Sequence, residues 1–159
     1  MKVLIIYDSV FGNTEQIAQG IGNALGSREN VGTFRVYNVK LEQLTGVELL
    51  IVGSPTRGFR PTEAITSFLK RISVNGLKGI KVAAFDTRLS MSDIESSAVR
   101  FIVKTGGYAA KLIADSLKKS EGDLIMPPEG FLVKGEEGPL KEGELERAAD
   151  WAKQIMAAL

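Results

Sequence analysis

Residues 3–14 read VLIIYDSVFGNT, and this stretch decides the fold. Val3–Tyr7 is short, continuously apolar and rich in β-branched residues, which predicts a strand that is buried on both faces. A polar loop follows and leads into an amphipathic helical pattern, with the hydroxyls of Ser9 and Thr14 on either side of Gly12. Backbone N–H groups and a helix dipole at such a point suit a phosphate group. The same residue types would also cap a helix that binds nothing, so the loop alone leaves both interpretations open.

The rest of the chain repeats this alternation of strands and helices. Four further strands are expected at Thr33–Val39, Leu49–Gly53, Lys81–Phe85 and Asp123–Met126, the last resuming at Phe131–Val133 beyond Pro127 and Pro128. Helical patterns cover Asn13–Leu25, Thr62–Ile72, Ile94–Lys104, Tyr108–Lys118 and Glu142–Ala158, with a break at Gly106-Gly107 and with Trp151 in the core. This order predicts a single α/β domain over residues 1–159, a three-layer α/β/α structure with a five-stranded parallel sheet. Ligands of such sheets bind beyond the carboxyl ends of the strands, so the loops that follow the strands are the candidate site.

The composition excludes several classes of function. The chain has no cysteine and no histidine, which removes disulfides, thiol chemistry, imidazole acid–base catalysis and the commonest metal ligand. The apolar run at the N-terminus is too short for a signal peptide or a membrane span, so we expect a cytoplasmic protein without a membrane span. Twenty basic and 19 acidic residues give no reason to expect nucleic acid as a partner. The phosphate-binding pattern of nucleoside triphosphate sites is absent too, so any reaction must use carboxylates, hydroxyls, backbone amides or a bound cofactor.

Two more loops follow predicted strands and are rich in small or polar residues. Residues 53–61 read GSPTRGFRP, which predicts a shaped and fairly rigid turn with room for a planar ligand. Residues 85–90 read FDTRLS and follow the next strand. Neither loop by itself identifies the ligand.

Taken together, the three loops resemble those of the flavodoxin family. Residues 9–15 look like its phosphate loop, residues 53–58 are similar to the segment that passes one face of the flavin ring, and Asp86-Thr87 falls where the other ring loop begins. The resemblance covers essentially the whole chain and implies the strand order 2-1-3-4-5 and one non-covalently bound FMN. It also implies that the Gly58 peptide reorients when the flavin is reduced. The cofactor-binding residues that it implies are Ser9, Val10, Phe11, Gly12, Asn13, Thr14, Pro55, Thr56, Arg57, Gly58, Phe59, Asp86, Thr87, Arg88 and Leu89.

The chain departs from the family pattern in both ring loops. Arg57 stands where the second loop often carries tryptophan, and Leu89 lies near the place where the third often carries tyrosine, which leaves aromatic stacking on the ring open. Arg57, Arg60 and Arg88 also place three cations where the family is usually acidic. One interpretation is that they are solvated arginines paired with Glu63, Asp93 or Glu95. The other is a positive rim that docks an acidic partner or an anionic substrate.

We predict a small electron carrier that exchanges electrons with redox partner proteins through FMN. One alternative is a small FMN-dependent oxidoreductase acting on a quinone or another small molecule, with residues 126–140 as a partial lid. Turnover of a quinone with a pyridine nucleotide would separate the two. Another alternative is a flavin-free signalling module. A phosphoacceptor receiver needs clustered acids and a lysine after its last strand, and this chain offers Asp8 and Asp86 with no lysine until Lys134. The colour of the purified protein would test this alternative.

Overall fold

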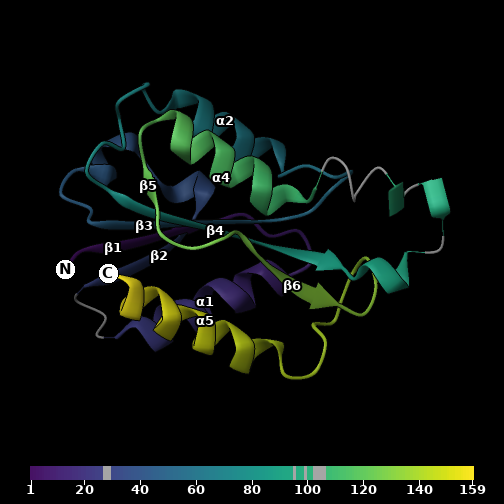
Figure 1. The fold of residues 1–159 in the computed structure, drawn as a ribbon. Coiled ribbons are helices and arrows are strands. Elements are labelled where there is room, and N and C mark those ends of the chain that lie inside the picture. Colours follow the sequence, from purple (N-terminus) through teal and green to yellow (C-terminus); the bar gives the residue numbers. More distant parts are fainter. Residues whose placement is uncertain (27–29, 95, 99, 102–106) are drawn as a thin grey trace.

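The structure, a computed structural model, describes residues 1–26, 30–94, 96–98, 100, 101 and 107–159 (Figure 1). Its sheet has the order β2-β1-β3-β4-β5, and every pairing between strands is parallel. The strands are β1 (Val3–Tyr7), β2 (Val31–Arg35), β3 (Leu49–Pro55), β4 (Lys81–Leu89), β5 (Asp123–Leu124) and β6 (Glu129–Val133). The α-helices are α1 (Asn13–Leu25), α2 (Glu63–Arg71), α4 (Ala109–Lys119) and α5 (Glu144–Ala158). The predicted three-layer α/β fold and its strand order are confirmed.

Two helical layers bury the sheet, with α2 and α4 on one face and α1 and α5 on the other (Figure 1). All five residues of β1 are buried, as the continuous apolar run requires. Trp151 of α5 is 2% exposed and packs edge-on against Phe85 and Phe131, with ring centroids 6.1 and 6.0 Å away. Its predicted place in the core is therefore confirmed. Gly53 is required beside this cluster, because a Cβ there would lie 2.1 Å from the Phe85 ring.

The central strands differ from the sequence prediction mainly in length. β3 and β4 continue through Pro55 and Leu89, so both carry part of the predicted ring loops inside the sheet. The predicted strand Thr33–Val39 is wrong in its second half: β2 starts earlier and ends at Arg35, and residues 36–38 form a 3₁₀ turn. Apolar Val36 and Val39 are buried all the same, because this turn packs them into the core on the α2 side.

The last strand is divided into two short ones, both paired with β4. β5 pairs with residues 81 and 82, and β6 pairs with residues 85–89. Proline offers no N–H to a ladder, so Pro127 and Pro128 fall between the two pieces. The extra strand β6 brings Gly130 opposite Asp86.

The segment between β4 and α4 only partly supports the predicted helix Ile94–Lys104. A 3₁₀ turn occupies Met91–Asp93, and Ile94 ends it, so the helix does not begin there. Residues 97, 98, 100 and 101 are helical, whereas the predicted positions 95, 99 and 102–104 lie outside the described residues, as does Gly106. Gly107 has a φ of +80° and precedes α4, in agreement with the predicted break. Among the helices described in the structure, none is long and apolar enough to cross a membrane.

Candidate functional site

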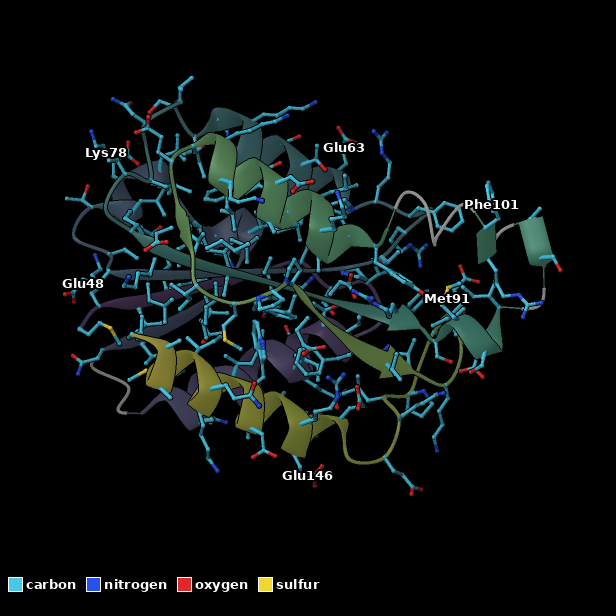
Figure 2. The ribbon with its side chains drawn as sticks, in the orientation of Figure 1. Glu48, Glu63, Lys78, Met91, Phe101 and Glu146 are labelled. Atoms are coloured by element: carbon cyan, nitrogen blue, oxygen red, sulfur yellow. The ribbon has the colours of Figure 1, made fainter. Side chains whose placement is uncertain are left out.

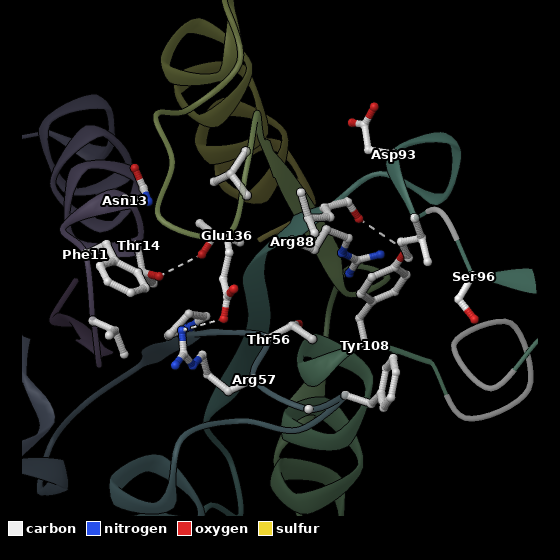
Figure 3. A pocket seen from close by; sticks show the side chains of 18 residues that line it. Phe11, Asn13, Thr14, Thr56, Arg57, Arg88, Asp93, Ser96, Tyr108 and Glu136 are labelled. Atoms are coloured by element: carbon white, nitrogen blue, oxygen red, sulfur yellow. Dashed lines mark hydrogen bonds and ion pairs between the residues drawn. The ribbon is translucent and has the colours of Figure 1, made fainter. Parts of the chain in front are cut away.

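The loops that follow β1, β3 and β4 meet at one edge of the sheet and enclose a cavity of about 540 Å³ (Figure 3). This edge contains the switch point of the sheet, because β1 lies between β2 and β3. Of the predicted site residues, Ser9, Gly12 and Asp86 do not line the cavity themselves. The others line it: Val10, Phe11, Asn13, Thr14, Pro55, Thr56, Arg57, Gly58, Phe59, Thr87, Arg88 and Leu89.

The first loop presents backbone donors at the N-terminus of α1. Gly12 caps the helix with a φ of +91°, a conformation that favours glycine. The Ser9 hydroxyl oxygen accepts from the N–H groups of Gly12 at 3.1 Å and Glu15 at 3.3 Å, and so holds the loop closed. Within the described chain, no protein group accepts from the backbone N–H groups of Val10, Phe11, Asn13 and Thr14. Four donors at the positive end of a helix dipole make an anion site.

A polar network under this loop holds it in place. Arg35, the last residue of β2, donates to the Ser9 carbonyl at 2.8 Å and lies 3.5 Å from the buried Asp8 carboxylate. It also pairs with Glu15 at 3.1 Å, and Glu15 accepts the Tyr7 hydroxyl at 2.6 Å. Burial and the bond to Glu15 raise the pKa of Tyr7 to about 12, while the Tyr7 hydroxyl and Arg35 lower the pKa of Glu15. The sequence did not indicate this role of Arg35, because only the β1–β2 pairing places it beside the loop.

The second loop is a tight two-residue turn. Arg57 and Arg60 exchange both backbone hydrogen bonds, at 2.8 and 3.0 Å, around Gly58 with φ +53° and Phe59 with φ +67°. Two positive φ values and this bonding define a type I′ turn. Glycine adopts such a φ readily, whereas Phe59 is strained there. The Thr56 N–H donates to the Thr87 carbonyl at 2.9 Å, which ties this turn to the third loop.

The end of β4, which the sequence predicted as the third loop, contains a buried ion pair at the base of the cavity. Asp86 is fully buried and receives both Nε and Nη2 of Arg88, at 2.7 and 2.8 Å, together with the Ala110 N–H at 2.9 Å. Burial raises the pKa of Asp86, and Arg88, Ala110 and the Thr56 hydroxyl oppose that shift. The Arg88 guanidinium stacks on the Tyr108 ring, 3.7 Å from its centroid, beside the cavity (Figure 3).

The arginines are paired differently from the partners that the sequence suggested. Arg57 lies over the Phe11 ring, 5.4 Å from its centroid, and reaches Glu136 at 3.9 Å, so it spans from the second loop to the loop after β6 (Figure 3). Arg88 pairs with Asp86, and the suggested partner Asp93 pairs instead with Lys141 at 2.7 Å. Glu95 lies outside the described residues. Long-range packing therefore selects the partners of Arg57 and Asp93. Arg88, in contrast, pairs with a residue two positions before it in the same strand.

Several lining residues were missed by sequence reasoning: Asp93, Ile94, Ser96, Tyr108, Val133 and Glu136. Four of them come from the connection between β4 and α4, and no motif marks their approach to the cavity. Val133 ends β6 and Glu136 follows it, and both lie within residues 126–140, which the sequence suggested as a partial lid. Tyr108 precedes α4, and its hydroxyl donates to the Leu89 carbonyl at 3.3 Å, so the aromatic ring lies beside the loop where Leu89 replaces the expected tyrosine. The one available signal was an aromatic residue at the start of the predicted helix Tyr108–Lys118.

Comparison with known families identifies the family to which this fold belongs. The sequence model described as the flavodoxin domain matches residues 4–126, which extend from the second residue of β1 to just beyond β5 and include all three loops. The chain belongs to the flavodoxin family. No curated protein sequence matches this flavodoxin-family chain.

Solved flavodoxin structures share the fold over its full length. A flavodoxin from the domain Archaea has a TM-score of 0.76 and 24% identity, with 99% of this chain and 97% of that one covered. Flavodoxin 2 from Bacillus cereus, in its oxidised form, has a TM-score of 0.78 and 22% identity, with both chains covered completely. The two-electron reduced flavodoxin from Megasphaera elsdenii has a TM-score of 0.67 and 20% identity, with 96% and 98% covered.

Proposed function

We propose that this protein binds one FMN non-covalently in the cavity and carries electrons between partner proteins. The observation that carries the proposal is a set of four backbone N–H groups, just before and at the start of α1, for which the described residues offer no acceptor. They lie beside a cavity large enough for a flavin nucleotide. The Ser9 and Thr14 hydroxyls lie at the same point, and Thr14 is held by a 2.8 Å hydrogen bond to Thr87. A single anion site without a dinucleotide motif fits one phosphate, hence FMN and not FAD. When bound, FMN supplies a group that takes up and releases electrons one at a time.

The residues present fit the remainder of such a cofactor. The turn at residues 57–60 and the strand end at residues 86–89 border the cavity on two sides. Arg88 keeps its Nη1 without a partner among the described residues, so this nitrogen can donate to a carbonyl on the polar edge of a ring. The Tyr108 ring and Phe59 supply aromatic surface that Arg57 and Leu89 do not.

The turn also fits a peptide that reorients with the redox state. Rotation of the peptide between Gly58 and Phe59 converts a type I′ turn into a type II′ turn, which returns the second central residue to a negative φ. Phe59 then loses its strain, and Gly58 takes a conformation that its missing Cβ allows. The chain therefore places glycine at the position that needs it in both forms.

The phosphate site is tested by comparing two ligands. Ser9→Ala combined with Thr14→Ala removes two hydroxyls that can bond a dianion, each worth about 1.5–3 kcal/mol, so FMN affinity should fall at least about tenfold. Riboflavin, which has no phosphate, should bind the variant and the parent protein alike. Ser67→Ala, an exposed hydroxyl on α2, is the matched control. An equal loss for both ligands would place the phosphate elsewhere, and rapid turnover of a quinone with a pyridine nucleotide would favour the enzyme over the carrier.

A further inference from the structure

The two helical layers carry opposite charge, although the formal net charge of the chain is only +1. On α2 and α4, five basic residues outnumber two acidic ones: Lys70, Arg71, Lys111, Lys118 and Lys119 against Glu63 and Asp115. On α1 and α5, four acidic residues outnumber two basic ones: Glu15, Glu144, Glu146 and Asp150 against Arg147 and Lys153. Figure 2 shows Glu63 and Glu146 on these opposite layers. The molecule is therefore polarised across its sheet, with its positive face over α2 and α4.

A groove of about 800 Å³ runs along this positive face between α2 and α4. Arg60, Lys70, Lys118 and Lys119 line it, and all four are exposed. In the described part of the chain, Lys118 has an ion-pair partner, Asp115 at 3.8 Å, while Arg60, Lys70 and Lys119 have none. Four cations against the carboxylates of Glu63 and Asp115 give the groove a formal net charge of +2, which projects a positive potential into solvent.

The groove begins where the cavity ends. Arg60 lines the groove and closes the turn whose Gly58 and Phe59 line the cavity, through backbone hydrogen bonds with Arg57. A protein interface of ordinary size covers about 800 Å² on each partner, which is enough to extend over both the turn and the start of the groove. A partner seated in the groove would thus also contact the rim of the proposed flavin site.

We propose that the groove between α2 and α4, together with the turn at residues 57–60, is the docking surface for an acidic redox protein. Carboxylates clustered beside the partner's own redox centre would face Arg60, Lys70 and Lys119, and would steer its approach. Glu63 and Asp115 lie in the same groove, where they would repel a continuous phosphate backbone but leave room for separate carboxylate side chains. The inference rests on the proposed electron-carrier function and specifies two more features of the partner, its acidic charge and the surface to which it binds.

The test compares two charge reversals that change the net charge equally. Lys70→Glu with Lys119→Glu alters the groove, and Lys78→Glu with Lys153→Glu alters exposed lysines outside it. Electron transfer from the FMN-loaded protein is followed by stopped flow. A small acidic iron–sulfur ferredoxin is the probe, and basic cytochrome c is the redox protein of opposite charge used for comparison. At low salt the groove variant should associate with the ferredoxin about tenfold more slowly than the parent, at the lower end of the usual steering effect. The control variant should lose much less, and high salt should remove the difference.

Binding without electron transfer separates this proposal from the function on which it rests. Calorimetry with the ferredoxin measures docking whether or not the flavin is redox-active. Both lysines lie in last helical turns, where a negative charge is unfavourable, so the glutamate variant can be unstable. In that case Lys70→Gln with Lys119→Gln replaces it. Weaker binding by the groove variant alone supports the proposal, even if no electron moves. Equal losses in both variants would show an effect of net charge and overturn it. Tighter, groove-dependent binding of a single-stranded oligonucleotide would assign the surface to a polyanion and overturn it as well.

Discussion

Gly130→Ala should destabilise the fold through the ion pair at the base of the cavity. A Cβ at this position would lie 2.1 Å from Nε, 2.2 Å from Cζ and 2.6 Å from Nη2 of Arg88. Both of these nitrogens, Nε and Nη2, donate to the Asp86 carboxylate, and the guanidinium already stacks on Tyr108. Contacts shorter than 3.0 Å are not tolerated, so Arg88 has to move away from a carboxylate that is fully buried.

The expected loss in the free energy of unfolding depends on the hydrogen bond that Asp86 retains when Arg88 moves away. Breaking a buried ion pair by removing one partner costs about 3–5 kcal/mol. Asp86 still accepts the Ala110 N–H, and Arg88, whose side chain is 21% exposed, can reach water. We therefore expect a loss of about 2–4 kcal/mol, which lowers the melting temperature by roughly 5–15 °C in a domain of this size.

Chemical and thermal denaturation measure this loss, with Gly20→Ala as the control. A Cβ at Gly20, inside α1, would meet the Leu145 side chain at an ordinary 3.7 Å, so that change should be neutral or stabilising by about 0.5–1 kcal/mol. In an Arg88→Ala background the clash is gone, and Gly130→Ala should cost little. A Gly130→Ala protein within about 0.5 kcal/mol of the parent, or an equal loss in both backgrounds, would show that the clash with Arg88 does not destabilise the fold.

Three further changes test other parts of the account. Gly58→Ala should lower the free energy of unfolding by about 1–2 kcal/mol because of its positive φ, and should also lower the potential of the first one-electron step. Phe59→Gly should raise the free energy of unfolding by up to about 1 kcal/mol. Denaturation measures the stability of each variant, and potentiometry measures the potential. Arg57→Gln should lower the potential of the second one-electron step by only about 20–40 mV, because the side chain is 41% exposed and faces an exposed Glu136; a shift that does not shrink with salt would contradict this. Glu144→Gln should flatten the loss of stability in acid. Burial raises the pKa of Glu144, but Arg147 and the backbone N–H of Leu132 outweigh burial and hold this pKa below its usual 4.5. The contribution of Glu144 to stability is therefore present above pH 4.5 and is lost as the pH falls through the lowered pKa. Denaturation at a series of pH values measures this change.

The sequence predicted those features that depend on local pattern. Continuous apolar runs placed β1 and the start of β3 and β4, and the amphipathic stripe of Asn13–Leu25 placed α1 to the residue. The three loops of the cavity followed from the fold, since the carboxyl ends of parallel strands meet at one edge. The predicted range of β2 differs from the observed one because Val36 and Val39 are apolar in order to pack into the core from a 3₁₀ turn, and not because they belong to a strand.

The features that the sequence did not predict depend on long-range packing or on a conformation that the residue type disfavours. Nothing local links Tyr108 to Arg88, or Glu136 to Arg57, because β6 and α4 bring them together only in the folded chain. A type I′ turn is normally signalled by Asn-Gly or Gly-Gly, whereas this one has a phenylalanine at its second position. The charge difference between the helical layers was hidden by the balanced totals and becomes visible once the helices are assigned to faces.

The most direct test of the central claim is the visible absorption spectrum of the purified protein, with the released chromophore identified and counted. We expect flavin absorption and one FMN per chain, released on denaturation and rebound by the refolded apoprotein. The anion site at the start of α1, together with the absence of a dinucleotide motif from the sequence, supports FMN over FAD. A colourless protein that also fails to bind added FMN would contradict the account, as would release of FAD.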